Sequence, residues 1–424
     1  MATTSMIIRR RLAVKSQTRR FIMGAFFVLV GLLIFILFAA TVTSDEMTKF
    51  VMTPGGLTRG VMGDWIIPSQ LTLYMMMAFC LILGVFQLVK GFGRWTNLVL
   101  GLVVVSFIFS FLTWSAAGKQ LNLAGMLSSA VLLSVPIVLA AFAGVLAERA
   151  GIVNIAIEGM MLMGAMVGAL VGSVTKNPWI GLFTAIFSAM LLGWLHGILS
   201  IKYRINQIVS GTVINIFATG LTSYLSQKFL QPYEYLNAPP MFSRIPIPVL
   251  ADIPLIGPLF FNTNLFVYAM FIFLIILQVS LFKTRWGLRM RAVGEHPKAA
   301  DTLGINVFKT RYMAILLSSA MAGFAGAFYT LASVGRFDEE MTAGKGFIGI
   351  AAMIFGNWTP IGSMGAGFLF GFADSMASKL SLVGSSIPPQ FMAMLPYIAT
   401  MIVLAGVVGK GQMPAADGEP YEKG

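Results

Sequence analysis

Long apolar stretches, separated by short polar connections, run along most of this sequence. Most stretches are about 18–23 residues long, enough for a helix to cross a hydrocarbon core roughly 30 Å thick. Backbone N–H and C=O groups find no water in lipid, so stretches of this length are predicted to be helices. We expect twelve, near residues 21–42, 68–89, 96–114, 125–146, 157–175, 178–200, 206–226, 265–282, 311–333, 346–357, 361–380 and 391–409.

The segments 346–357 and 361–380 are separated by glycine and proline residues, and the first is short. They are expected either as two spans or as a broken, re-entrant pair, which membrane proteins tolerate where protein covers the backbone. GIVNIAIEGMMLMGAMVGALVG at 151–172 is weakly similar to GFIGIAAMIFGNWTPIGSMGAG at 346–367, which suggests two weakly related halves. Glycines four residues apart, at 164, 168 and 172, predict a tightly packed helix face.

Basic residues lie in alternate connections. They precede the first stretch and follow the second, the sixth and the eighth, where a mixed-charge loop runs from Lys283 to Arg311. Lysine and arginine accumulate in cytoplasmic loops, so these connections and both termini are predicted to be cytoplasmic. This distribution accounts for the net charge of +13 without a nucleic-acid partner. The predicted fold is an all-α polytopic membrane protein with about 12 (10–12) transmembrane helices.

Four regions are expected along the chain. A basic cytoplasmic N-terminus (1–20) precedes an extension with about three spans (21–120), a main membrane domain (121–409) and a cytoplasmic tail (410–424). The connection 227–264 holds seven of the 18 prolines, so it is not a regular span. Its apolar residues suggest a structured lid on the membrane surface, and a plain linker is the alternative.

Composition removes several classes of protein. A mean hydropathy of +0.85 with 57% hydrophobic residues excludes a soluble domain. The single cysteine, Cys80, cannot form an intrachain disulfide and is expected to be a packed thiol. The sequence contains no HExxH, no GxxxxGK[ST] and no nucleophile–base pattern. We therefore expect no enzyme, no metal site and no cofactor bound by this chain itself.

Polar residues within the apolar stretches are few, and charge buried in a membrane is costly and commonly functional. Glu158 follows Asn154 by four residues, so both are predicted on one helix face near the cytoplasmic start of a span. They either line or gate a pathway, or they bond neighbouring helices; His196 is expected to be an interhelical hydrogen-bonding group. The candidate pathway or gating residues are Asn154, Glu158, Gly159, Asn215, Asn357 and Asp374.

The loop 283–311 contains a predicted short helix that begins at Pro297 and stops at Gly304. It is expected to be amphipathic, with Ala299, Ala300 and Leu303 towards one side. A passive basic loop would not require such a helix with acidic residues. It is therefore predicted to dock a partner protein, through Gly294, Glu295, Pro297, Ala299, Ala300, Asp301, Leu303 and Gly304.

Three motifs in this order, ERAGIVNIAIEGMMLMGAMVG, WGLRMRAVGEHPKAADTLGINV and GFIGIAAMIFGNW, resemble the permease subunits of ABC importers. The similarity is to the branched-chain amino acid, ribose and simple-sugar group, and within it to the nucleoside-uptake branch. It covers about 124–409. By this resemblance Gly294, Glu295, Ala300 and Gly304 match the coupling-helix motif, and Asn154, Glu158 and Gly159 match the NIxxEG positions. The first 120 residues depart from the pattern.

The resemblance implies a permease in the plasma (inner) membrane of a prokaryote. Its expected partners are a second permease, identical or different, two ATPase subunits that bind ATP and Mg, an extracytoplasmic binding protein, and lipid. The substrate would be a nucleoside or a simple sugar. The alternative is an ion-coupled secondary transporter of small polar solutes, for which only Glu158 and Asp374 offer a coupling-ion site.

Overall fold

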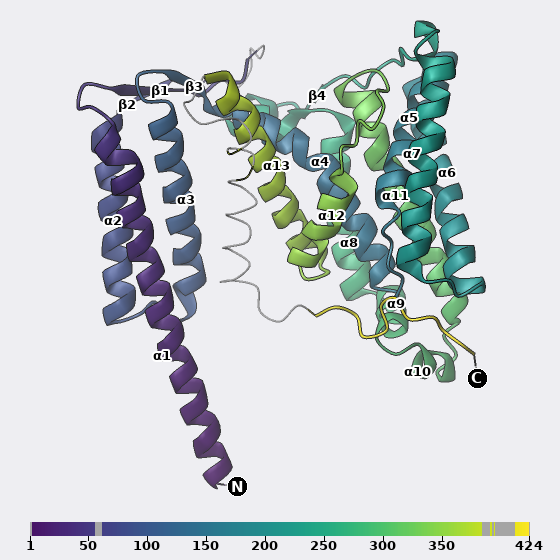
Figure 1. Ribbon diagram of the computed structural model, residues 1–424, viewed down its shortest axis with the longest axis horizontal. Helices are drawn as coiled ribbons and strands as arrows, with labels where there is room; N and C mark the ends of the chain where they lie inside the picture. The colour runs from purple at the N-terminus through teal and green to yellow at the C-terminus, as the bar shows by residue number, and fades with distance from the viewer. Residues whose placement is uncertain (1, 56–61, 384–390, 392–393, 395–411, 424) are drawn as a thin grey trace. The chain divides into compact units, whose positions relative to one another are not determined.

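The computed structural model describes residues 2–55, 62–383, 391, 394 and 412–423 (Figure 1). The chain forms two compact units. The first comprises Met1–Leu57, Val61–Gly125 and Ser378–Pro389, and the second Thr58–Gly60, Met126–Ala377 and Gln390–Gly424.

The first unit contains three long helices and a small sheet. The helices are α1 (Ala2–Leu33), extended by a further turn at Ile34–Phe38, α2 (Ser69–Val89) and α3 (Thr96–Ser115). The strands β1 (Met47–Val51), β2 (Trp65–Pro68) and β3 (Gln120–Asn122) pair in the order β2-β1-β3, with β1 antiparallel to β2 and parallel to β3. Phe50 lies opposite both Trp65 and Leu121. Cys80 is buried in this unit and is free.

Among the described residues, the second unit is built mainly of ten helices, of which α4 begins and α13 ends in the first unit. They are α4 (Leu123–Glu148), α5 (Ile157–Thr175), α6 (Pro178–Gly197), α7 (Gln207–Leu225), α8 (Leu265–Lys283), α9 (Arg285–Glu295), α10 (Pro297–Thr302), α11 (Val307–Phe328), α12 (Lys345–Phe355) and α13 (Pro360–Val383). Several begin at side-chain caps. Asn177, Asn264, Thr284 and Asn306 each accept a hydrogen bond from a backbone N–H of the first turn that follows.

Close helix packing forms the core of the second unit. α5 packs against α6, α7 and α11. A Cβ atom at position 164 would lie 2.9 Å from the Gly323 carbonyl oxygen, so only glycine permits this approach of α5 and α11. The predicted small-residue face is therefore confirmed here as a packing surface.

Within the described residues, nine helices are long and apolar enough to cross a membrane. They correspond to the first nine predicted spans. The tenth, 346–357, is α12, whose 11 residues extend about 16 Å and are too short to cross a 30 Å core. The eleventh is the long helix α13, and the twelfth, 391–409, falls almost wholly outside the described residues. A polytopic helical protein is thus established without the full count of twelve.

The two similar segments adopt different structures. Residues 151–156 are not helical, whereas the matching residues 346–351 lie in α12. The expectation of two related halves therefore gains no support from local structure.

The connection 227–264 is structured rather than a plain linker. It contains single turns and strand β4 (Ile245–Pro246), which pairs with β5 (Asn262–Thr263). The Phe242 N–H donates to the Leu331 carbonyl oxygen at 2.8 Å, and the Phe242 ring packs on Trp179. We call this end of the second unit the lid end. The other end carries α9 and α10 (lower end of this unit in Figure 1) and is called the basic end after the cationic residues of 283–311.

Candidate functional site

The loop 283–311 folds into two helices, α9 and α10, at the basic end. The sequence predicted α10 and missed α9, whose arginines at 285, 289 and 291 resembled a simple basic loop. α10 begins at Pro297, and the His296 side chain accepts a hydrogen bond from the Ala299 N–H at 3.1 Å. Gly304 follows with φ +79°, a conformation that suits glycine at a helix end. The predicted start and stop are confirmed.

At Gly294, α9 packs closely against the connection between α4 and α5. A Cβ atom there would lie only 2.4 Å from the Arg149 carbonyl oxygen, so position 294 requires glycine. The neighbouring Glu295 is exposed, and its Oε2 accepts a hydrogen bond from the Ala415 N–H at 3.3 Å. These residues position α10 relative to the helix bundle.

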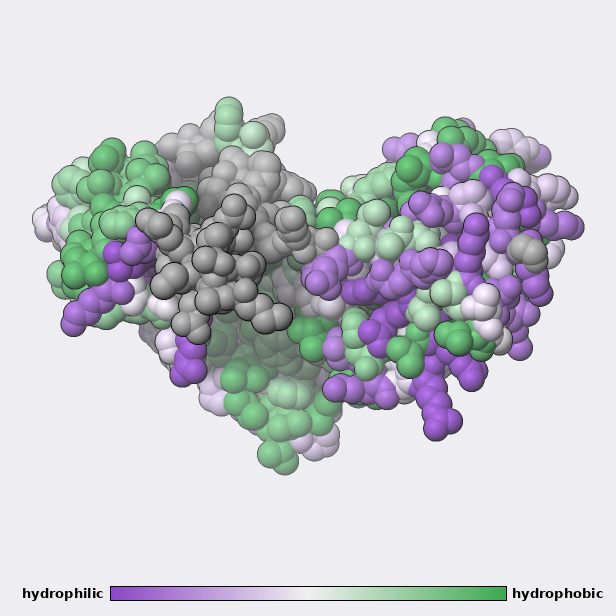
Figure 2. Space-filling view, turned by 90° about the horizontal axis from the view of Figure 1, so that it is seen from below, coloured by the Kyte–Doolittle hydropathy of each residue, from purple (hydrophilic) through white to green (hydrophobic). Residues whose placement is uncertain are grey.

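The faces of α10 differ from the prediction. Ala300 is buried in a cluster with Val293, Val307 and Tyr421, whereas Ala299 is exposed and Leu303 is 81% exposed. The expectation that the three apolar residues share one side is wrong, because Ala300 packs on the bundle while Ala299, within the same helix, and Leu303, just after it, are exposed. Seen from below, the surface at this end of the second unit is largely hydrophilic (Figure 2). Leu303 is an exposed apolar residue at this end.

A second site centres on Glu158, in the first turn of α5. Its Oε1 accepts hydrogen bonds from the Thr342 hydroxyl at 2.6 Å and the Gly344 N–H at 2.9 Å, and its Oε2 accepts one from the Gly346 N–H at 2.6 Å. The carboxylate therefore caps the N-terminus of α12, where the helix dipole favours negative charge.

Glu158 lies at one end of α12. The other end of α12 lies at the basic end, where Arg149 donates to the Trp358 carbonyl oxygen at 2.8 Å. Because α12 has 11 residues, its two ends lie roughly 16 Å apart. Glu158 is the second residue of α5, so it lies at the start of a candidate span, as predicted.

Asp374 joins the same region. Its carboxylate forms an ion pair with Lys345, the first residue of α12, and both side chains are about three-quarters buried. The Tyr329 hydroxyl is buried within electrostatic reach of Glu158 and Asp374, and it has no hydrogen-bond partner among the described residues. The structure thus brings the two candidate carboxylates to one short helix.

Asparagine side chains form hydrogen bonds with and from the non-helical segment 151–156, which precedes Glu158. Asn215 accepts from the Gly159 N–H at 2.8 Å and donates to the Ile155 carbonyl oxygen at 2.9 Å. Asn154 donates to the Ser318 hydroxyl at 2.9 Å. Asn154 precedes α5, so the prediction that it shares a helix face with Glu158 is wrong. In this connection the asparagines act as interhelical hydrogen-bonding groups.

His196 belongs to the same framework. Its two ring nitrogens lie 3.0 Å from the Ser210 hydroxyl and 3.1 Å from the Val153 carbonyl oxygen. The predicted interhelical role of this buried histidine is confirmed.

Asn357 lies apart from the other candidates, at the basic end. Asn357 and Trp358 both have left-handed backbone conformations, with φ +54° and +52°. Arg149 donates to both of their carbonyl oxygens, at 3.2 and 2.8 Å. The Trp358 indole N–H donates to Glu148, and the Asn357 Oδ1 accepts from the Gln412 N–H at 2.7 Å. Both sides of this joint lie in motifs of the sequence, ERAGIVNIAIEGMMLMGAMVG and GFIGIAAMIFGNW, but the sequence did not predict that they meet.

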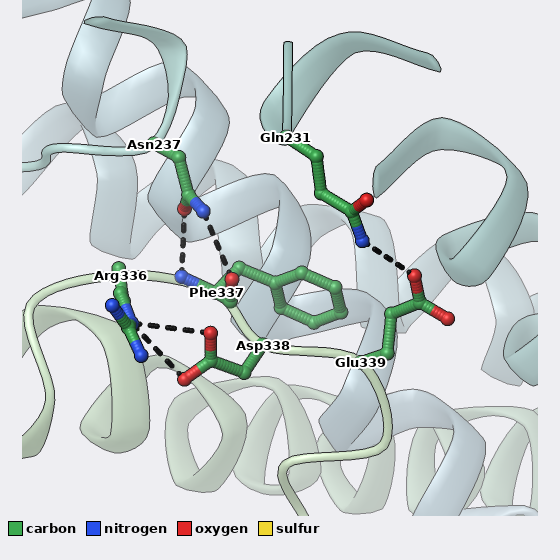
Figure 3. A network of polar contacts seen from close by, with 6 residues as sticks. All are labelled: Gln231, Asn237, Arg336, Phe337, Asp338 and Glu339. Atoms are coloured by element: carbon green, nitrogen blue, oxygen red, sulfur yellow. Dashed lines mark hydrogen bonds and ion pairs between the residues drawn. The ribbon is translucent and has the colours of Figure 1, made fainter. Parts of the chain in front are cut away.

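The lid end contains a polar cavity of about 490 Å³, lined by Ser226, Leu230, Gln231, Glu234, Asn237, Ala238 and residues 336–339. Figure 3 shows how its walls are fixed. Asn237 exchanges two hydrogen bonds with the Phe337 backbone, Gln231 donates to Glu339 at 2.8 Å, and Arg336 pairs with Asp338. Three carboxylates face one guanidinium, so the cavity is acidic.

The family comparison decides the class of protein. The family described as branched-chain amino acid transport system / permease component matches residues 126–405, which is 280 of the 424 residues. The chain belongs to this family. The resemblance inferred from the three motifs is confirmed, and the protein is a multi-pass permease subunit of the ABC importer type.

Two relatives match nearly their whole length. The guanosine ABC transporter permease protein NupQ of Bacillus subtilis is 39% identical over 302 residues, 68% of this chain and 93% of that protein. The nucleoside ABC transporter permease protein NupC of Lactococcus lactis is 40% identical over 313 residues, 70% of this chain and 96% of that protein. No solved structure was found to match this chain.

Proposed function

We propose that this permease carries nucleosides into a prokaryotic cell as one subunit of an ATP-driven importer. The similarity to permeases named for guanosine and nucleosides, at 39% and 40% identity, carries this proposal. Simple sugars are the second candidate, since the sequence motifs are shared with that group. The permease performs no covalent chemistry, and its partner ATPases bind ATP and Mg.

The basic end faces the cytoplasm in this proposal, as the concentration of lysine and arginine favours. An ATPase subunit docks on α9 and α10 there. Leu303 is the apolar anchor, and the exposed polar residues around it form the rim that interfaces typically have. Gly294, Pro297 and Gly304 shape this surface, Glu295 and Asp301 supply charge, and Ala300 packs it onto the bundle.

The polar cluster around Glu158 is the gating element. Its carboxylate ties α5 to the first turn of α12, and Asp374 ties α13 to the same turn through Lys345. A movement of α12 would break these bonds and change the packing of three helices together. Asn154, Gly159 and Asn215 keep the connection before α5 in place during that movement.

The lid end faces the extracytoplasmic binding protein. Its cavity has the size of a small-molecule site, and its carboxylates and amides suit hydroxyl groups or cationic side chains. A second permease, identical or different, completes the pathway. The first unit, which includes the predicted extension 21–120, is accessory to the transporter.

Uptake by reconstituted vesicles tests this function. The permease is assembled with its second permease and ATPase subunits, and labelled guanosine is supplied with the binding protein. We expect uptake that needs hydrolysable ATP, survives a protonophore and is inhibited by unlabelled nucleosides but not by glucose. Inhibition by glucose alone would reassign the substrate to sugars. Uptake by the permease alone, abolished by the protonophore, would instead establish the secondary transporter.

A further inference from the structure

Residues 412–423, here called the C-terminal segment, lie at the basic end and outside the region matched by the family model. The segment has no helix or strand, yet it is not a loose tail. Pro414, Ala416 and Tyr421 are buried, the last two with 4% and 5% of their surface exposed. A free hydrophilic tail would not bury an aromatic ring, so the segment is an integral part of this end of the unit.

Its first contacts connect α9 with the end of α12. The Gln412 N–H donates to the Oδ1 of Asn357 at 2.7 Å, and Asn357 lies two residues after the end of α12. Three and four residues later, the Ala415 N–H donates to Glu295 and the Ala416 N–H donates to the Gly294 carbonyl oxygen at 2.9 Å. A stretch of five residues thus spans the distance between these two elements.

Its remaining contacts reach the bundle. Arg311, buried in α11, donates to the Glu419 carbonyl oxygen at 2.9 Å, and Asp417 lies beside the carboxyl group of Glu148 at the end of α4. The Tyr421 ring lies 5.3 Å from the Phe308 ring and shares a cluster with Ala300 of α10. The segment therefore contacts α9 and α10, which form the docking surface. It also contacts the ends of α4 and α12, between which the Arg149 joint lies.

We propose that the C-terminal segment is a strut that transmits the displacement of α9 and α10 to the basic end of α12. Since the N-terminus of α12 is capped by Glu158, a force applied at Asn357 reaches the gating cluster along one short, stiff helix. Arg149 provides a parallel link, because it contacts Gly294 through its backbone and Trp358 through its side chain. The proposal rests on the importer function proposed above.

Truncation in the complete transporter tests the strut. One variant ends after Gly411, and its matched control ends after Glu422, which keeps every contact described above and the ion pair between Glu422 and Arg204. Association with the ATPase, ATP hydrolysis and guanosine uptake are measured on each reconstituted complex. We expect the shorter variant to retain its ATPase and to hydrolyse ATP, while uptake per ATP falls by about tenfold or more. The control keeps the wild-type ratio.

A point variant separates transmission from folding. Tyr421→Ala empties the cluster around Ala300, and Tyr421→Phe keeps the ring. Uptake per ATP should fall in the first and be restored in the second. An unchanged ratio in the shorter truncation overturns the strut, and so does loss of the ATPase from that complex, because the segment would then act in docking. Failure of the importer function is distinct, since the wild-type complex would then show no ATP-dependent uptake.

Discussion

A single carboxylate, Glu158, connects three hydrogen-bond donors of another part of the chain to the start of α5. Two of these donors are backbone groups at the N-terminus of α12, which have no partner within the helix. The side chain therefore contributes both to the stability of the second unit and to the position of α12.

Glu158→Gln should lower the stability of the permease and reduce uptake. The amide nitrogen of glutamine cannot accept from the Gly346 N–H, so a buried donor loses its partner at a cost of about 1.5–3 kcal/mol. Thermal unfolding in detergent and guanosine uptake measure the two effects. Tyr329→Phe is the control: it removes a nearby hydroxyl without touching α12 and should leave stability unchanged or higher. Equal stability of Glu158→Gln and the wild type would contradict the capping role.

Leu303 and Ala300 separate docking from folding. Leu303→Asp should leave membrane insertion unchanged and weaken ATPase binding about tenfold to a hundredfold, because burying a leucine is worth about 1.5–3 kcal/mol. Ala300→Arg should instead destabilise the permease, since a charge would enter the cluster with Val293 and Val307. Co-purification of the ATPase and thermal unfolding distinguish the two. Normal ATPase binding by Leu303→Asp would remove this residue from the interface.

At the scale of the element, the C-terminal segment carries a titrating group. Burial raises the pKa of the Asp417 carboxyl to about 6, above its ordinary 3.8, while the Glu148 hydrogen bond and the Arg311 charge oppose this shift. The docked segment thus holds a proton that the undocked segment releases. Its docking should be tightest below about pH 3.8, weaken as the pH rises to 6, and then stay constant.

Hydrogen exchange at the Ala416 N–H, corrected for the intrinsic rate, measures this dependence between pH 4.5 and 7.5. Asp417→Asn is neutral throughout, so its protection should not fall with pH. Lys423→Gln, changed at an exposed side chain of the same segment, should behave as the wild type. Wild-type protection that increases with pH would contradict the assigned pKa shift.

At the scale of the whole molecule, the residues of both candidate sites lie in the second unit, which contains most of the family match. A chain that begins at residue 121 should therefore insert, bind its ATPase and take up guanosine within about threefold of the full chain, as compact units commonly fold independently. The full chain carrying Leu303→Asp provides a low-activity reference. Loss of ATPase binding on removal of residues 1–120 would show that the first unit takes part in assembly.

Sequence reasoning found the elements better than the sites. Apolar length predicted nine long helices with small errors in their ends, because lipid enforces helices of that length. Pro297 and Gly304 marked α10 by local chemistry alone. The exposure of Leu303, the capping of α12 by Glu158 and the joint at Arg149 were not predictable, since each depends on contacts between residues far apart in the chain.

The joint at Asn357 and Trp358 has a mechanical meaning. Two consecutive residues without glycine's freedom occupy the left-handed region, which costs of order 1–3 kcal/mol for each residue. Arg149 donates to both carbonyl oxygens, and these hydrogen bonds offset part of that cost. Without the Arg149 side chain the turn would lose both donors, and the cost would favour a different conformation at the end of α12.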